Sequence, residues 1–140
     1  MRNYLGELQG ILDTYGEELE AAGKKRKAAS GIFGFGPKPG DDPCHEKADR
    51  AVQTLLEQLA GENDPETAGQ VVDGLFRAEA ERKWPADAQI MMIALQRHAL
   101  PLLEQLPPEK KRELQAWYEK RYKRSQRLPL QKTILKLLKE

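Results

Sequence analysis

Cysteine, aromatic side chains and long apolar runs are all scarce in this chain of 140 residues. Its one cysteine, Cys44, has no second cysteine with which to form a disulfide inside the chain. No apolar run approaches the ~20 residues that a membrane-spanning helix needs. The first ten residues also lack the uninterrupted apolar stretch of a signal peptide. These absences predict a protein without a membrane span in the reducing environment of the cytoplasm.

The residues that are abundant favour helices. Charged side chains make up 32% of the chain and hydrophobic side chains 39%, whereas the β-branched and aromatic residues that favour strands are few. A chain of this length fits one domain and can bury a substantial core. We therefore predict an all-α fold that forms a single domain over residues 1–140.

Apolar periodicity and proline positions predict a bundle of about six helices. Residues 3–29 repeat apolar side chains in steps of three and four. Four prolines stand where a helix would begin, a position that tolerates the missing amide hydrogen. The predicted helices cover residues 3–29, 43–61, 65–83, 86–106, 108–125 and 129–140, and the prolines are Pro43, Pro65, Pro108 and Pro129.

Two helices carry further expectations. The segment 86–106 is apolar on nearly every side, which predicts a central, buried helix, and Pro101 should kink it because proline has no amide hydrogen to donate. In the first helix, Gly6 and Gly10 lie four residues apart and so share a face. We expect that face to allow close approach of another helix.

A Gly/Pro-rich segment connects the first two predicted helices. It holds four glycines and two prolines around Ile32, Phe33 and Phe35. The prolines restrict the backbone, and the three large apolar side chains are poorly suited to water. We predict an ordered loop over residues 31–42 whose apolar side chains pack onto the bundle.

Four residues form one hypothesis for a chemical site. His45 and Asp49 are four residues apart on one helix face, Cys44 is adjacent, and His98 lies at the edge of the apolar helix. Together these side chains offer nitrogen, oxygen and sulfur ligands for a metal site, or the parts of a thiol-dependent site. The alternative is structural, and the sequence favours it: Cys44 packs as a small apolar residue, while His45 and Asp49 form a surface pair.

Charge is segregated along the chain although the net charge is only +1. Residues 41–106 hold six basic and thirteen acidic side chains, whereas residues 107–140 hold eleven basic and four acidic ones. The basic end also contains Trp117, Tyr118 and Tyr122, a mixture that suits phosphate contacts and base stacking. The corresponding nucleic-acid or partner surface would consist of Lys110, Lys111, Arg112, Lys120, Arg121, Lys123 and Arg124.

The aromatic residues of the basic end favour a different reading of that segment. They recur at helical spacing together with Leu114, which predicts that they face the core. No residue pattern identifies a cofactor or a catalytic group. We therefore predict a non-enzymatic helical bundle that acts as an interaction or structural module, with another protein or a second copy of the chain as its partner. Nucleic-acid binding through residues 107–140 and the metal- or thiol-dependent site are the alternatives.

Overall fold

The computed structural model describes residues 2–33, 43–84 and 86–140, with the side chains of 24–33 and 86–87 left aside. Within these ranges the chain is helical and contains no strand, which confirms the all-α prediction of about six helices. The elements are α1 (Tyr4–Phe33), α2 (Pro43–Glu62), α3 (Pro65–Glu81), α4 (Ala86–Leu95), the 3₁₀ turn η2 (Gln96–Ala99), α5 (Leu100–Leu103), α6 (Pro108–Arg121), the 3₁₀ turn η3 (Arg124–Gln126) and α7 (Pro129–Lys139).

Proline stands at the first position of four helices, as predicted. Pro43, Pro65, Pro108 and Pro129 open α2, α3, α6 and α7. The best-formed of these starts is that of α3, where the Asp64 carboxylate accepts hydrogen bonds from the backbone amide and the hydroxyl of Thr67. These bonds to the ionised form lower the pKa of Asp64. The start of α7 is capped differently: the side-chain oxygen of Gln131 accepts a 2.8 Å hydrogen bond from the backbone amide of Leu128.

The helix that is expected to kink at Pro101 is interrupted just before this residue. The α-helical hydrogen bonds of α4 end at Leu95, a 3₁₀ turn covers Gln96–Ala99, and α5 follows as a single short turn. Because Pro101 lacks an amide hydrogen, the carbonyl of Arg97 has no donor four residues ahead. It accepts instead from the amide of Leu100, three residues ahead. The element that the sequence indicates as one helix is therefore two helices joined by a tighter turn.

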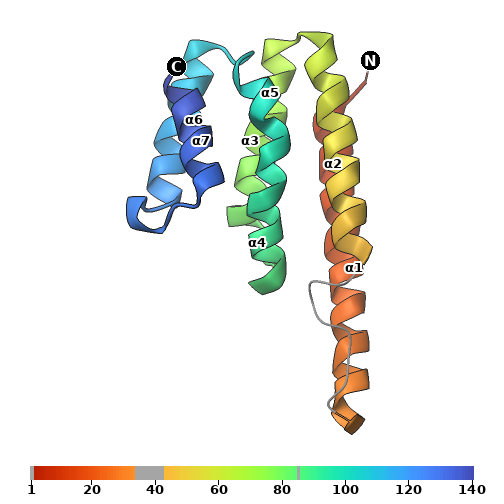
Figure 1. Cartoon of the computed structure of the whole chain (residues 1–140). Coiled ribbons are helices and arrows are strands. Elements are labelled where there is room, and N and C mark those ends of the chain that lie inside the picture. The colour runs from red at the N-terminus through yellow and green to blue at the C-terminus, as the bar shows by residue number, and fades with distance from the viewer. Residues whose placement is uncertain (1, 34–42, 85) are drawn as a thin grey trace.

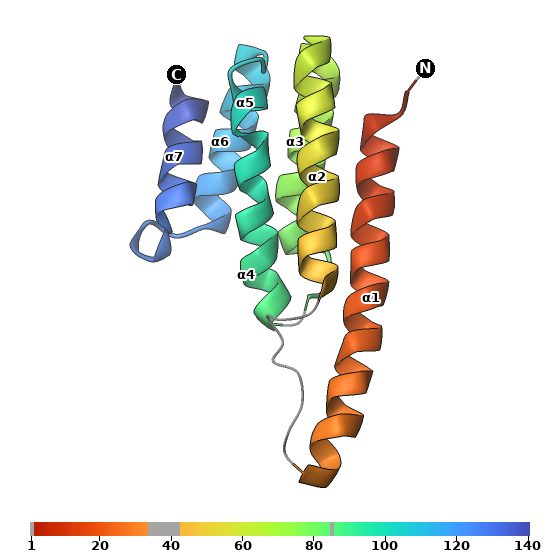
Figure 2. The ribbon, with the colours of Figure 1, turned by 45° about the vertical axis from the view of Figure 1, so that its right-hand side comes forward.

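The helices lie side by side as upright rods, with α4, η2 and α5 in the middle (Figures 1 and 2). On one side α1 packs against α2 and α3, and on the other side α6 and α7 pair with each other and contact α3 and α5. The two ends of the chain lie at the same end of the bundle (Figure 1). One continuous core runs through all of these elements, from Tyr4, Leu8 and Leu12 in α1 to Ile134 and Leu138 in α7.

The apolar side chains that recur along the first helix are buried, as predicted, but the helix does not come close to another helix at Gly10. Leu8, Leu12, Tyr15 and Leu19 are buried. A Cβ at Gly10 would meet nothing within 4 Å, so the expected close helix approach does not occur there. The close approach lies instead at Gly74 of α3, where a Cβ would stand 2.9 Å from a methyl group of Leu5.

The predicted loop over residues 31–42 starts later than expected, because α1 continues through Phe33. The remainder of that prediction, residues 34–42, lies outside the described part of the chain. Among the described residues, no helix is both long enough and apolar enough to cross a membrane.

Candidate functional site

His45 and Cys44 lie in the interior, at the start of α2. Cys44 belongs to the core, as its structural interpretation predicts. His45 is buried as well, and its Nδ1 lies 2.6 Å from the hydroxyl oxygen of Tyr15, with which it shares a hydrogen bond. The predicted surface pair of His45 and Asp49 is therefore wrong. The packing of α1 against α2 covers this face of α2 and supplies a partner thirty residues away in the chain.

Asp49 is engaged by the 3₁₀ turn of the central rod. One carboxylate oxygen lies 2.9 Å from Nε2 of His98 and accepts a 2.7 Å hydrogen bond from the guanidinium of Arg97. Two of the four residues in the metal or thiol hypothesis, Asp49 and His98, are thus in contact. Within the described ranges no group of three or more His, Cys, Asp or Glu side chains has a metal-holding arrangement. The metal- or thiol-dependent site stays a sequence-based prediction.

The aromatic residues of α6 face the core, in agreement with the preferred sequence interpretation. Tyr118 is fully buried, and Trp117 and Tyr122 are half-buried against the core. The Tyr118 ring lies 5.2 Å from that of Phe76 and 4.6 Å from that of Tyr122. Trp117 is covered by the guanidinium of Arg77, 5.3 Å from its ring centre. These rings contribute to the packing of α6 against the core.

A polar network around the buried side chains of Glu79 and Gln96 joins α3, η2 and the end of α6. It involves the hydroxyl groups of Tyr118 and Tyr122. The Tyr118 hydroxyl donates to Gln96 Oε1 at 2.8 Å, and Gln96 Nε2 donates to the Tyr122 oxygen at 3.2 Å. The Tyr122 hydroxyl donates in turn to Glu79 at 2.9 Å, and Arg121 donates to both oxygens of the same carboxylate. Glu79 and Gln96 are buried, so each bond replaces one to water that folding removes.

Sequence reasoning missed Glu79 and Gln96, although Glu79 left a detectable signal. It falls on the apolar face of α3, three and four residues after Phe76 and Leu75, where a carboxylate needs a buried partner. No comparable pattern marks Gln96, whose partners come from α6.

The free energy of unfolding is expected to fall as the pH rises above about 10, the ordinary pKa of tyrosine. Burial raises the pKa of Tyr118 far above this value, with repulsion from Tyr122 and Glu79 adding to the effect. Burial likewise raises the pKa of Tyr122. Above pH ~10 the unfolded chain therefore releases protons that the folded chain retains, which favours unfolding. Urea unfolding at increasing pH measures this slope, and Tyr118→Phe should flatten it; an identical slope in the variant would contradict the assignment.

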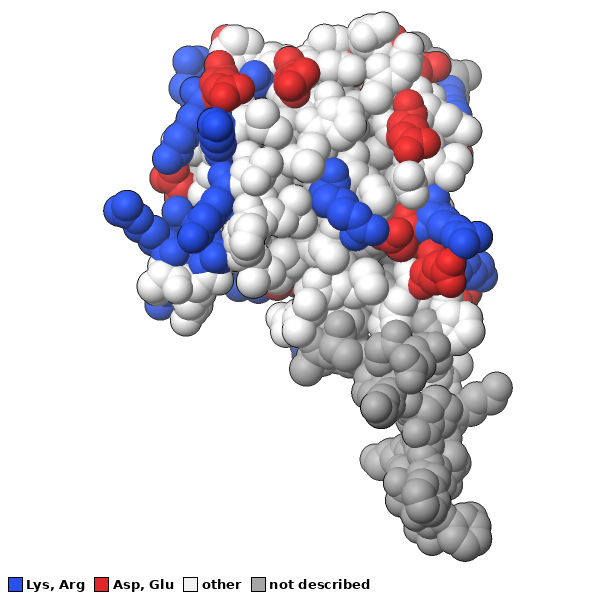
Figure 3. Space-filling view, viewed as in Figure 1, with Lys and Arg blue, Asp and Glu red and all other residues white. Residues whose placement is uncertain are grey.

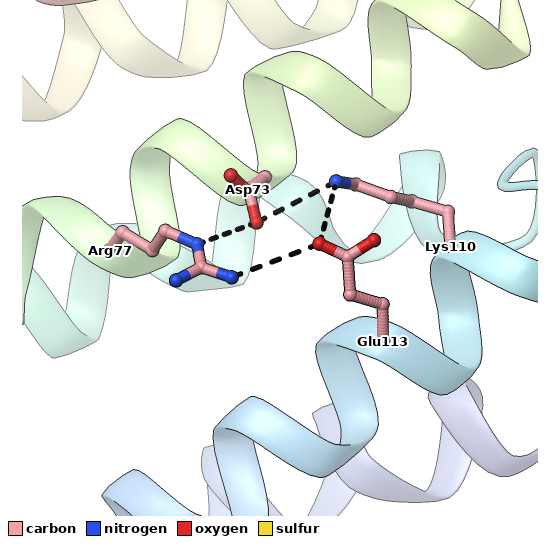
Figure 4. A network of polar contacts seen from close by, with 4 residues as sticks. All are labelled: Asp73, Arg77, Lys110 and Glu113. Atoms are coloured by element: carbon pink, nitrogen blue, oxygen red, sulfur yellow. Dashed lines mark hydrogen bonds and ion pairs between the residues drawn. The ribbon is translucent and has the colours of Figure 1, made fainter.

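Part of the basic C-terminal segment is used to hold the bundle together. Lys110 lies 3.7 Å from Asp73 of α3 and 3.5 Å from Glu113 of its own helix, and Arg77 completes the cluster through Asp73 (Figure 4). A Cβ at Gly69 would lie 3.2 Å from the Lys110 side chain, so glycine leaves room for the lysine stem to cross α3. Lys110 is therefore committed to the α3–α6 contact.

The other predicted surface residues divide into engaged and exposed ones. Arg121 is bonded to Glu79, and Lys111 is half-buried. By contrast, Arg112, Lys120, Lys123 and Arg124 are exposed, and α7 adds two exposed lysines, Lys132 and Lys136. Lys and Arg side chains gather over α6 and α7 at the left of the space-filling view (Figure 3). We call these six exposed residues the basic face: Arg112, Lys120, Lys123, Arg124, Lys132 and Lys136.

A groove lies beside the basic face, where α4 meets the η3 turn and the start of α7. Its volume is about 520 Å³, and Glu79, Arg121 and Tyr122 of the buried network line it. Ile90 and Ile93 line it from α4, and Leu128 lines it from the segment before α7. Ile90 is 69% exposed and Leu128 47% exposed. The prediction of a central, buried helix over 86–106 is therefore wrong at Ile90, because no other helix of the described residues covers that face of α4.

A second groove, of about 490 Å³, lies between α1 and α2. Gly10, Ile11, Ala48 and Ala51 are among the residues that line it, and its surface is mostly apolar. Its charged members are engaged in ion pairs: Lys47 Nζ lies 2.6 Å from Glu18, and Glu7 pairs with Arg2. Among the residues that line it, there is no group of unpaired cations like the basic face.

Comparisons with protein-family models, with curated proteins and with solved structures find no match for this chain.

Proposed function

We propose that this protein is a non-enzymatic interaction module that binds an acidic segment of another protein on its basic face. In this proposal α1 to α5 form the scaffold, and α6, η3 and α7 present the binding surface. The observation that carries the proposal is the state of the six basic side chains. They are exposed, and no carboxylate in the described part of the chain lies within ion-pair distance of any of them.

The contrast with the rest of the surface supports this proposal. Three exposed cations elsewhere on the described surface pair with acids: Lys47 with Glu18, Arg50 with Glu46, and Arg97 with Asp49. Lys83, after α3, is exposed and forms no ion pair within the described residues. On α6 and α7 like charges stand close together, and their mutual repulsion opposes folding. An arrangement of this kind favours association with a negatively charged partner, which removes the repulsion and speeds the encounter.

An acidic protein segment fits the surface better than a nucleic acid does. Sequence-tolerant binding of single strands relies on accessible aromatic rings between the cations. Here Tyr118 is buried, and Trp117 and Tyr122 pack against the core. The groove beside the cations contains the exposed apolar side chains of Ile90 and Leu128 among polar ones. Apolar and basic groups side by side suit an amphipathic acidic peptide.

Reversing two charges of the basic face tests the proposal. A fluorescent glutamate-rich peptide should bind the protein at low salt, and Lys120→Glu combined with Lys123→Glu should weaken binding at least tenfold. The physical reason is that each reversal replaces an attraction by a repulsion on a surface where salt screens the interaction. Fluorescence anisotropy at several salt concentrations measures the effect.

The matched control is Lys83→Glu, an exposed charge reversal after α3. It should leave the affinity of the peptide nearly unchanged. Equal peptide binding by the double variant and the unaltered protein would reject the basic face. Preferential binding of duplex DNA or RNA, with a steep salt dependence that the double variant loses, would replace the acidic protein partner with a nucleic acid.

A further inference from the structure

We propose that the groove between α4, η3 and α7 receives a large apolar side chain from an acidic helical segment of the partner protein. This inference rests on the proposed function and assigns the place at which the partner is anchored. The basic face would attract the segment, and the groove would hold it. The residues that carry the inference are Ile90, Ile93 and Leu128, with Lys123 at their border.

Two exposed apolar side chains meet in this groove. Ile90 and Leu128 are the two large apolar side chains that remain exposed in the described chain, and both line this one groove. They come from segments nearly forty residues apart, so their meeting is a product of the tertiary fold. Contiguous exposed apolar surface is uncommon on soluble proteins and marks sites of association. Covering it removes apolar area from water, which is the main driving force for docking.

The groove is also held in shape before a partner binds. The Arg121 and Tyr122 side chains that line it are tied to the buried Glu79 carboxylate by hydrogen bonds of 2.9 to 3.1 Å. Gln131 fixes the other side, where its side chain accepts from the Leu128 amide. A surface that is already ordered loses little conformational entropy on binding. These contacts therefore favour a defined anchor pocket over a loose apolar patch.

The charges in and beside the groove favour an acidic segment as the partner. Glu79 is the one carboxylate of the groove lining, and Arg121 neutralises it, which leaves the charge of Lys123 uncompensated. Arg124, Arg127 and Lys132 follow within the same short stretch of chain. An acidic segment complements these cations, whereas a basic one would be repelled. A helix can present apolar anchors on one face and carboxylates on the flanks, and groove binding of such helices is a common recognition mode.

Three synthetic peptides test the anchor separately from the charge. The first is a helical glutamate-rich peptide with two leucines four residues apart, and the second has alanine at both leucine positions. The third keeps the leucines and has lysine in place of glutamate. The first peptide should bind at least tenfold more tightly than the second, since leucine buries more apolar area, and the third should not bind.

Protein variants assign the difference to the groove. Ile90→Gln combined with Leu128→Gln should reduce the affinity for the leucine peptide to that of the alanine peptide. The matched control, Ile11→Gln in the groove between α1 and α2, should leave both affinities unchanged. Amide chemical shifts on adding the leucine peptide should change in residues 89–93 and 121–131. Because Ile90 and Leu128 are exposed, the double variant should keep the melting temperature of the unaltered protein.

The outcomes separate this inference from the proposed function. Equal binding of the leucine and alanine peptides, with charge reversal still weakening both, would overturn the anchor and leave the basic face in place. Failure of every acidic peptide to bind would reject both. Self-association that Ile90→Gln and Leu128→Gln abolish, without peptide binding, would overturn the inference in favour of a second copy as occupant. Sedimentation velocity detects that case.

Discussion

Gln96→Leu is expected to lower the free energy of unfolding by about 2–3 kcal/mol, although leucine has nearly the volume of glutamine. The Tyr118 hydroxyl is buried and donates to Gln96 at 2.8 Å, so the substitution leaves a buried donor without an acceptor. Tyr122 loses one bond as well but keeps its bond to Glu79. Urea unfolding followed by circular dichroism measures the change.

The control for this prediction removes the second partner. In the double variant with Tyr118→Phe, no hydroxyl is left unpaired, so part of the lost stability should return. A double variant that is destabilised by the simple sum of the two single changes would contradict a direct interaction between Gln96 and Tyr118.

Phe76→Ala is expected to destabilise the fold by about 3–5 kcal/mol, the largest effect predicted for a single apolar side chain. Phe76 is fully buried in α3, and its ring lies 5.2 Å from that of Tyr118. Removing it leaves a cavity where α3 meets α6, because the backbones around it cannot close the space. Thermal and urea unfolding report the loss.

Ile90→Ala is the matched comparison. The sequence places Ile90 in the most apolar segment, yet 69% of it is exposed. Its removal should change the free energy of unfolding by less than about 0.5 kcal/mol. A loss comparable to that of Phe76→Ala would show that Ile90 is a core residue and would remove it from the docking groove.

The helices were predictable because their signals act over a few residues. Proline at 43, 65, 108 and 129 restricts the backbone locally and cannot donate a hydrogen bond, so its effect on a helix start does not depend on the rest of the fold. The same holds for Pro101, whose missing amide hydrogen is accompanied by the 3₁₀ turn just before it. The burial of Tyr118 followed from its spacing relative to Leu114.

The candidate site was only partly predictable. Whether a basic residue of this site is exposed or held in an ion pair depends on which side chains of other helices lie next to it. Among the predicted basic residues, Lys120 and Lys123 are exposed, whereas Lys110 and Arg121 are held by Asp73 and Glu79 of α3. All four look alike in the sequence, and the partners of Lys110 and Arg121 lie about forty residues earlier in the chain. Likewise, nothing near His45 in the sequence indicates that Tyr15 becomes its hydrogen-bond partner.

The sequence by itself determined the helices, their starts, the interruption at Pro101 and the excess of positive charge in residues 107–140. Only the tertiary structure decided which cations remain available and that Ile90 and Leu128 meet in one exposed groove. The physical reason is that backbone restriction and helical periodicity act between near neighbours. Burial and pairing depend on which helices pack together, and that choice is a property of the whole chain.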